Sequence, residues 1–261
     1  MNLHDTCIVI PTKRSPPLKT LESYHNQFPK DVSIFLIVDP SLLDEHKRWL
    51  DQKGWRYPGT LTLVKGKSGL VPQVRFCYTI ARKHGYKYFF RLDDDCAPNF
   101  FVRKDRSNPP LRSVIRWARQ CIDVTETSLV GFANTSRVDW LGRGYARSYA
   151  LVHGGAQMVK AVHPDKVLPE EIVCYEDIYR SCAHRQIDGA VGRVQFVGMN
   201  KIDGMKDTVN RAGKSKWKIG MKQLMRDFPG FGEFYGEADE KGIPKFRHKR
   251  HDGYRNTPPE K

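Results

Sequence analysis

The chain has 261 residues, of which 39% are hydrophobic and 28% charged, and its 44 Lys and Arg against 29 Asp and Glu give a formal net charge of +15. These values predict one large domain, or one domain with a tail, around a sizeable buried core. No apolar stretch approaches the roughly 20 residues that span a bilayer, and the N-terminus lacks the pattern of a secretory signal, so we expect a soluble cytoplasmic protein without a membrane partner.

The basic balance bears on the kind of partner. A surplus of positive charge of this size favours a polyanion such as nucleic acid, because binding releases condensed counterions. A basic surface that only keeps the protein soluble is the alternative. The six cysteines are scattered and form no CxxC pair, so we interpret them as reduced core residues and not as a zinc site.

Short apolar runs rich in Val, Ile and Phe alternate with segments of helical spacing, which predicts an α/β domain with a mainly parallel sheet. The expected strands are 7–11, 33–39, 60–64, 86–94, 128–133 and 193–198. The expected helices are 18–28, 42–52, 74–84, 111–122 and 178–186, and Gly85 is expected to end the third as a left-handed cap.

From about residue 201 the alternation decays into a segment rich in Gly, Pro and charge. We therefore expect a core at 1–200, followed by a basic C-terminal extension at 201–261 that is ordered at first and ends in a loose or partner-ordered tail. No internal repeat is visible.

Polar residues follow each of the first four expected strands. Thr12 and Arg14 follow the first, Asp39 closes the second, a Gly-rich segment at 65–69 follows the third, and Asp93 to Asp95 close the fourth. In a parallel sheet, ligands bind beyond the carboxyl ends of the strands, where the loops open and helix N-termini point inward. The sequence thus predicts a ligand site at this edge.

The acidic triplet needs a positive partner. Side chains alternate along a strand, so Asp93 and Asp95 are expected on one side and Asp94 on the other, leaving an Asp-x-Asp pair able to converge on one ion. Carboxylates suit Mg²⁺ or Mn²⁺, which can bridge nucleotide phosphates. The alternative is a solvated turn, or a cap on the segment before Pro98.

Two further segments carry candidate chemistry. Lys67 and Arg75 flank a Gly/Ser turn that feeds a helix, where Arg75 can pair with a diphosphate, although either residue can equally be a solvated charge. The segment is not a P-loop, because GxxxxGK[ST] is absent. Glu176 and Asp177 begin a helix, where one carboxylate can act as a general base or both can simply stabilise the helix N-terminus.

Taken in chain order, these features resemble the nucleotide-sugar-dependent glycosyltransferases of the GT-A fold, a Rossmann-like α/β architecture. The resemblance covers about residues 5–200 and includes the HGGAQMV stretch at 153–159. Within that fold the chain is most similar to the TET-associated glycosyltransferases of bacteriophages, which are related to the kinetoplastid enzyme that glucosylates hydroxymethyluracil. It lacks the QxxRW motif and membrane helices of polysaccharide synthases, so a polymer-making role is not expected.

The resemblance implies transfer of a sugar from a UDP-sugar, with Mn²⁺ or Mg²⁺, to the hydroxymethyl group of 5-hydroxymethylcytosine or 5-hydroxymethyluracil in double-stranded DNA, in the host cytoplasm if the gene is phage-encoded. It implies a donor site, a metal site and a catalytic pair. The donor residues would be Thr12, Arg14, Asp39, Lys67, Arg75, Asp93, Asp94, Gly154, Gly155, Lys214 and Lys216. The last two belong to the C-terminal extension, which would complete the active site. The metal ligands would be Asp95, Asp93 and His251, with His248 as an alternative to the last, and Asp177 would be the base beside Glu176.

Basic clusters are candidate DNA contacts, with an exposed solvated face as the alternative for each. They comprise Arg103, Lys104, Arg112, Arg116, Arg143, Arg147, Lys249 and Arg250. Two other functions stay open at this point: transfer to a protein or glycan hydroxyl, and a non-catalytic nucleic-acid-binding module. The sugar, the pyrimidine, the stereochemistry, the DNA context and the oligomeric state are also open.

Overall fold

The structure is a computed structural model. It describes residues 3–55, 61–95, 98–135, 137–172, 174–201, 213–235 and 245–248. The predicted site residues His251, Lys249 and Arg250 lie outside these ranges.

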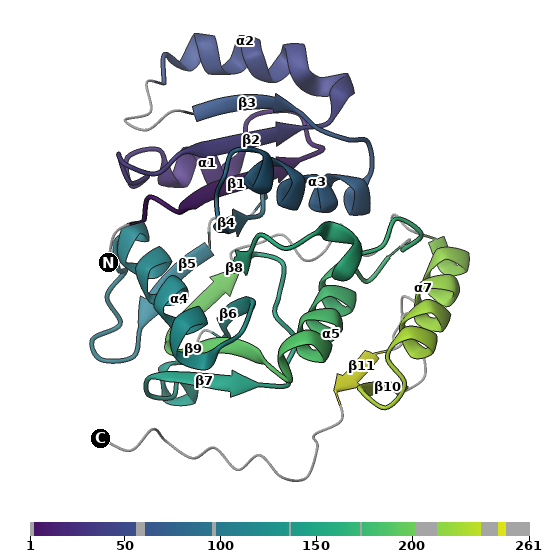
Figure 1. Cartoon of the computed structure of the whole chain (residues 1–261). Coiled ribbons are helices and arrows are strands. Elements are labelled where there is room, and N and C mark those ends of the chain that lie inside the picture. The colour runs from purple at the N-terminus through teal and green to yellow at the C-terminus, as the bar shows by residue number, and fades with distance from the viewer. Residues whose placement is uncertain are drawn as a thin grey trace.

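A nine-stranded sheet forms the centre of the molecule, in the order β3-β2-β1-β4-β8-β6-β9-β5, with β7 paired to β9 (Figure 1). Its strands are β1 (Thr6–Thr12), β2 (Ile34–Val38), β3 (Leu61–Lys65), β4 (Tyr88–Leu92), β5 (Pro98–Val102), β6 (Leu129–Asn134), β7 (Tyr145–Ser148), β8 (Ala156–Lys160) and β9 (Val191–Lys201). A separate hairpin joins β10 (Gly232–Tyr235) and β11 (Lys245–His248).

Strand direction divides the sheet into two sets. β1 pairs in parallel with β2 and β4, β2 with β3, and β6 with β9, whereas β8, β5 and β7 pair antiparallel with their neighbours. Because β8 runs antiparallel to both β4 and β6, the strands β1, β2, β3, β4, β6 and β9 all point the same way. These six are the strands that the sequence predicts, so the mainly parallel α/β fold is confirmed.

Helices cover both faces of this sheet (Figure 1). They are α1 (Lys19–Tyr24), α2 (Leu43–Lys53), α3 (Leu70–Lys83), α4 (Leu111–Thr125), α5 (Glu176–Asp188) and α7 (Gly213–Asp227), with the 3₁₀ turns η1 (Pro40–Leu42), η2 (Val138–Trp140) and η3 (Pro164–Lys166). Gly85 follows the end of α3 with φ +78°, as expected of a left-handed cap. None of the described helices combines the length and apolar character that a membrane span requires.

Each face of the sheet has its own apolar core. Along β1, Ile8 and Ile10 belong to the core under α1, α2 and α4, whereas Cys7 and Val9 belong to the core under α3, α5 and α7. Burial on both faces explains why these strands read as continuous apolar runs. The five cysteines in the described part of the chain are free and buried, as predicted.

In the described part of the C-terminal extension, the helix α7 packs on the core. Leu224 of α7 and Phe228, which directly follows this helix, are buried in the second core, and the ring of Phe228 lies 4.8 Å from that of Tyr179 in α5. The ordered segment that we expected after residue 201 therefore contains α7. That the extension completes the active site stays a prediction.

Candidate active site

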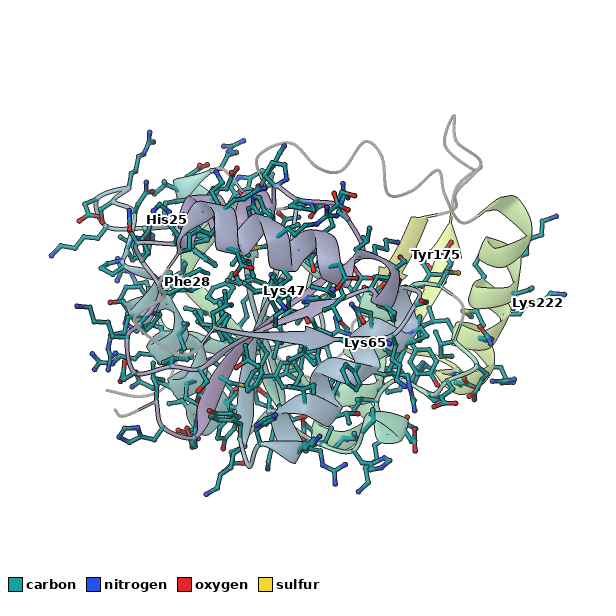
Figure 2. All side chains as sticks on the ribbon, turned by 90° about the horizontal axis from the view of Figure 1, so that it is seen from above. His25, Phe28, Lys47, Lys65, Tyr175 and Lys222 are labelled. Carbon is teal, nitrogen blue, oxygen red and sulfur yellow. The ribbon has the colours of Figure 1, made fainter. Side chains whose placement is uncertain are left out.

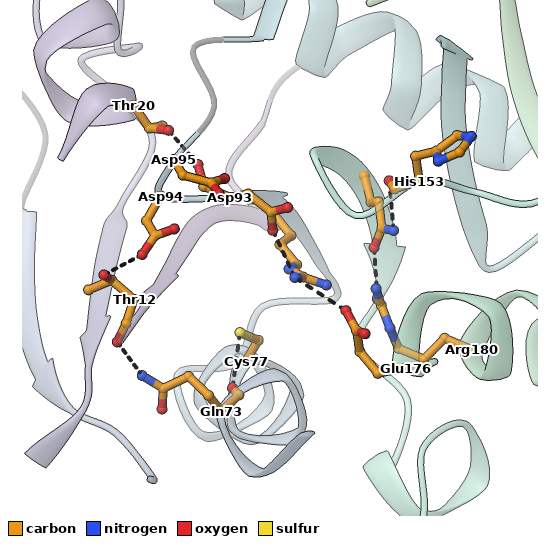
Figure 3. Close-up of polar contacts among 12 residues, drawn as sticks. Thr12, Thr20, Gln73, Cys77, Asp93, Asp94, Asp95, His153, Glu176 and Arg180 are labelled. Carbon is orange, nitrogen blue, oxygen red and sulfur yellow. Dashed lines mark hydrogen bonds and ion pairs between the residues drawn. The ribbon is translucent and has the colours of Figure 1, made fainter. Parts of the chain in front are cut away.

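The ends of β1 and β4 meet through polar side chains (Figure 3). Thr12 Oγ1 donates to Asp94 Oδ2 over 2.5 Å, and Arg14 Nη2 donates to Asp95 Oδ2 over 2.7 Å. Arg14 Nε also lies 3.6 Å from Asp94 Oδ1. Because both strands are parallel neighbours, residues far apart in sequence share one sheet edge, as the sequence predicts for Thr12, Arg14 and the triplet.

The carboxylates of the acidic triplet repel one another, and one of them is buried. Burial, together with the charges of Asp93 and Asp95, raises the pKa of Asp94 to about 6, although the Thr12 hydrogen bond and Arg14 oppose this rise. The triplet therefore accommodates positive charge readily.

The three carboxylates point to different partners. Asp94 faces Thr12, Asp95 faces Arg14, and Asp93 Oδ1 accepts from Arg91 Nη2 over 2.8 Å. The predicted strand continued to residue 94, but β4 ends at Leu92 and the triplet forms a turn. The alternation assumed for Asp93 and Asp95 was thus wrong, because strand geometry stops before them.

Gln73 on α3 was not predicted, yet it joins three of the strand-end segments. Its Nε2 donates to the carbonyls of Thr12 and Ile37 over 3.0 and 2.8 Å, and its Oε1 accepts from the amide of Lys67 over 2.7 Å. A Cβ on Gly66 would lie 2.2 Å from Gln73 Oε1, so only glycine allows this approach. The expected helix began at residue 74, whereas α3 begins at Leu70 and places Gln73 on its buried face.

The loops after β2 and β3 also meet. Asp39 Oδ1 accepts from the Ser41 amide over 3.1 Å and lies 3.5 Å from Ser68 Oγ. The hydrogen bonds from Ser41 hold the pKa of Asp39 below its usual range. Lys67 is exposed, and its Nζ lies 5.9 Å from the ring of Phe76. Both predicted residues therefore flank the strand-end site.

Arg75 has partners outside the strand-end site. Its guanidinium donates to the carbonyl of Leu168 over 2.5 Å, to Asp165 over 2.6 Å and to Glu170 over 3.0 Å. Contact between Arg75 and a donor diphosphate remains a prediction, and it requires these ion pairs to open. Spacing along the sequence could not reveal acidic partners so far along the chain.

The Gly-Gly turn before β8 lies against the acidic triplet. The amide of Asp93 donates to the carbonyl of Gly155 over 3.0 Å, and a Cβ on Gly154 would lie 3.3 Å from Asp93 Oδ2. The structure thus brings together three predicted donor-site residues. Small residues here leave the carboxylate of Asp93 open to approach.

Glu176 and Asp177 begin α5 after Tyr175, which has φ +59°, a strained value for a residue other than glycine. Glu176 Oε1 lies 3.9 Å from Arg91 Nη2, and Asp177 Oδ1 accepts from the Ile178 amide over 2.9 Å. Burial raises the pKa of both carboxyl groups. Two neighbouring acids with raised pKa values are candidates for proton transfer.

Arg180 anchors the start of α5 to β8. Its Nη1 donates to Gln157 Oε1 over 2.7 Å, and Gln157 Nε2 donates to the carbonyl of His153 over 2.9 Å (Figure 3). On the other side, Tyr175 lies towards α7, whose Lys222 is exposed (Figure 2). Glu176 and Asp177 are therefore held between the central sheet and α7.

The described residues hold no group of three or more His, Cys, Asp and Glu arranged as a metal site. Asp93 and Asp95 supply two carboxylates, with side chains 20% and 15% exposed. Lys214 and Lys216 lie in the first turns of α7, and their predicted phosphate contacts stay predictions.

The predicted DNA contacts fall into two sets. Arg112 pairs with Asp31 over 2.8 Å, and Arg147 Nη1 donates to the carbonyl of Thr125 over 2.6 Å, so these two arginines have partners within the chain. The second set comprises Lys104, Arg116 and Arg143, which are exposed, and Arg103, which is half-buried. None of these four forms an ion pair with a carboxylate in the described part of the chain.

Comparison with models of known protein families finds no match, and no curated protein is similar in sequence. Solved structures are similar in fold. GalNAc-T7 with UDP, GalNAc and Mn²⁺ has a TM-score of 0.59 at 13% identity, over 85% of this chain and 47% of that one. The mannosyltransferase PcManGT from Pyrobaculum calidifontis with GDP-Man and Mn²⁺ has a TM-score of 0.52 at 12% identity, over 78% of this chain and 59% of that one.

A fragment of TarS from S. aureus has a TM-score of 0.50 at 14% identity, over 84% of this chain and 65% of that one. The fold is that of the nucleotide-sugar glycosyltransferases. At these identities the likeness establishes the fold alone, and the chain spans between about half and two thirds of the three structures.

Proposed function

We propose that the protein is a metal-dependent glycosyltransferase that moves a sugar from a nucleoside-diphosphate sugar, a UDP-sugar in our proposal, to the hydroxymethyl group of a modified pyrimidine in DNA. The observation that carries the proposal is the meeting of Thr12, Arg14 and the acidic triplet at the carboxyl ends of parallel strands, with Glu176 on the other side of Arg91. The fold of nucleotide-sugar glycosyltransferases supports the same reaction class.

The donor would lie along the strand ends. In this proposal Thr12, Arg14 and Asp39 hold the nucleoside and Asp93 the ribose, while the glycines at 154 and 155 let the sugar approach the backbone. The diphosphate would face Lys67, with Lys214 and Lys216 of α7 approaching from the C-terminal extension. Arg75 would join them after leaving Asp165 and Glu170.

Asp93 and Asp95 are the carboxylates that we assign to a hard divalent cation. Mg²⁺ and Mn²⁺ sites of this kind use one or two carboxylates and complete their shell with water and substrate phosphates, so two carboxylates suffice. Both side chains are partly exposed, and Arg14 already contributes one positive charge at Asp95. When bound, such a cation stabilises the negative charge of the departing diphosphate. His251 is the proposed third ligand.

Asp177 would act as the general base. The bond between the anomeric carbon and the diphosphate oxygen breaks as the acceptor oxygen bonds to that carbon, and the acceptor proton passes to the carboxylate of Asp177. Burial raises the pKa of Asp177, and this makes its carboxylate a stronger base than that of an ordinary aspartate. Glu176, the acid next to Asp177, would carry part of the negative charge at the start of α5.

The choice of DNA as acceptor rests on charge and exposure. The chain carries a net charge of +15, and Lys104, Arg116 and Arg143 are exposed. Trp140 is 66% exposed, with the guanidinium of Arg137 over its ring at 4.7 Å. Basic side chains with an open aromatic ring suit a phosphate backbone and an unstacked base.

The test is to incubate the protein with hydroxymethylated or unmodified DNA, a panel of UDP-sugars and Mn²⁺, and then to weigh the digested nucleosides. We expect a nucleoside heavier by one sugar from hydroxymethylated DNA, and none from unmodified DNA. Asp177→Asn should lose this product while its melting temperature stays unchanged. Wild-type turnover by Asp177→Asn would refute the assigned base.

A second acceptor class, a protein or glycan hydroxyl, is favoured by the internal partners of Arg112 and Arg147, which reduce the basic surface open to DNA. Salt dependence separates the two acceptors. DNA binding that weakens steeply with ionic strength supports the first, and absent DNA binding together with sugar on a glycan supports the second.

A further inference from the structure

Arg91 is a buried charge in the middle of an apolar strand. Its side chain is 3% exposed, on β4, with Phe89 and Phe90 before it and Leu92 after it. Burying a guanidinium costs several kcal/mol unless it is well paired. Packing alone does not account for an arginine at this position.

The guanidinium meets two carboxylates through one nitrogen. Nη2 lies 2.8 Å from Asp93 Oδ1 and 3.9 Å from Glu176 Oε1, whereas Nε and Nη1 have no hydrogen-bond partner among the described residues (Figure 3). The buried charge of Arg91 is thus compensated by these two carboxylates. Because both carboxylates share Arg91, the position of each depends on the other.

The two carboxylates come from opposite sides of the proposed reaction. Asp93 belongs to the turn assigned to the donor, and Glu176 is next to Asp177, the proposed base. The glycine at 154 lets the groups lie close, because its Cβ position is 3.3 Å from Asp93 Oδ2 and 3.8 Å from Arg91 Nη2. A Cβ there would press on Asp93 and touch Arg91 at an ordinary contact distance.

Neighbouring polar groups fix the other side of this arrangement. Arg91 stands opposite Gln157 in the β4–β8 register, and Gln157 accepts from Arg180 over 2.7 Å. Arg180 is fully buried. The start of α5 is therefore tied to β4 by Arg91 and to β8 by Arg180.

We propose that Arg91 is a positioning residue that sets the distance between the donor turn and the base-bearing start of α5. The proposal rests on the proposed glycosyltransferase function. A shift of about 1 Å in the reacting groups costs roughly 10²-fold in rate, so loss of this bridge should lower kcat more than donor affinity. Thr12, Arg14 and Asp95 still hold the donor in its absence.

The test compares Arg91→Lys, Glu176→Gln and the double variant in the sugar-transfer assay. Lysine keeps the charge but has a shorter reach and one donor centre. We expect Arg91→Lys to fold, to keep KM for the UDP-sugar within about threefold and to lose kcat by about 10²-fold. In the Glu176→Gln background the same change should cost far less, because the bridge is already broken.

The matched control is Arg119→Lys, an arginine that lies over the ring of Tyr88 at the other end of β4 and pairs with Asp123. It should leave kcat unchanged. Wild-type kcat in Arg91→Lys, or additive losses in the double variant, would overturn the proposal, and an inactive wild type would instead refute the proposed function. Should Arg91→Lys fail to fold, the cycle of Asp93→Asn with Glu176→Gln decides: non-additive kcat losses support the bridge and additive losses contradict it.

Discussion

Arg14 Nη2 donates to Asp95 Oδ2 over 2.7 Å, so the carboxylate that we assign to a cation already forms an ion pair with an arginine. Arg14 and Arg91 are two positive partners of the acidic triplet in the described part of the chain, and they lie on opposite sides of it. A divalent ion bound at Asp95 would have to displace Arg14 or share the carboxylate with it. This competition is open to measurement.

Arg14→Met should destabilise the protein and increase its response to cations. Without the arginine, Asp94 and Asp95 repel each other more strongly, which should cost about 1 kcal/mol because Arg14 is partly exposed. For a chain of this size that is roughly 2–4 °C in melting temperature. Added Mn²⁺ should raise the melting temperature of the variant more than that of the wild type. Equal responses in the two proteins would contradict this account of the triplet.

Gln73→Leu should be strongly destabilising, because Gln73 is a buried residue of α3 whose side chain joins three strand-end segments. The change leaves the carbonyls of Thr12 and Ile37 and the amide of Lys67 without their partner, and each buried unsatisfied group costs about 1–3 kcal/mol. Urea unfolding gives the free energy. The control is Gln27→Leu, an exposed glutamine whose Nε2 is 3.5 Å from the Ser23 carbonyl. Equal unfolding midpoints for the two variants would show that the hydrogen bonds of Gln73 do not contribute to stability.

Gly220→Ala should impair transfer through the start of α5. A Cβ at this position of α7 would lie 2.3 Å from Cys174 Sγ and 3.1 Å from Tyr175 Cδ2, so α7 or the turn before Glu176 must move. Overpacking of this kind costs about 1–3 kcal/mol. The double variant with Cys174→Ala removes the closer contact and should recover most of the stability and turnover. A single variant that behaves like the wild type would mean that α7 does not constrain the catalytic pair.

His184 should make stability depend on pH. It is fully buried, with Nε2 3.2 Å from Tyr78 Oη and Nδ1 2.6 Å from Ser128 Oγ. Burial lowers the pKa of His184 to about 3 from an ordinary 6.5. Its contribution to stability is therefore complete above pH 6.5 and is lost as the pH falls towards 3, because the unfolded chain takes up a proton first.

The measurement is the unfolding free energy of the wild type minus that of His184→Gln between pH 7 and pH 4. We expect this difference to shrink by up to about 1.4 kcal/mol per pH unit below 6.5. His46, whose pKa is also lowered by burial, is present in both proteins and cancels. A difference that stays constant with pH would contradict a neutral buried His184.

The sequence predicted six strands, five of them largely buried and one, β3, only partly buried. The six parallel strands carry apolar side chains on both sides, and their ends placed Thr12, Arg14 and the triplet at one edge. The antiparallel strands were missed because their patterns are weak: β7 is half-exposed throughout, and β8 follows a Gly-Gly turn that reads as a loop. Tertiary pairing with β9 and β4 makes them strands.

The sequence indicated which strand ends carry polar residues, but not which side chains these residues contact. An arginine inside the apolar run YFFRL was a visible signal, since a charge in a buried strand requires a partner, but its partner Glu176 lies far along the chain. The partners of Arg75 were hidden for the same reason. Sequence spacing reports neighbours on one element and does not report which elements pack together.

The most direct test of the central claim, that the strand-end carboxylates form a metal-dependent nucleotide-sugar site, is calorimetric titration of UDP into the wild type and Asp95→Asn with Mn²⁺ or with EDTA. We predict that the wild type binds UDP at least about tenfold, or 1.4 kcal/mol, more tightly with Mn²⁺ than with EDTA. Asp95→Asn should bind weakly in both. Absence of UDP binding to the wild type, or equal Mn²⁺-dependent binding by Asp95→Asn, would contradict the claim.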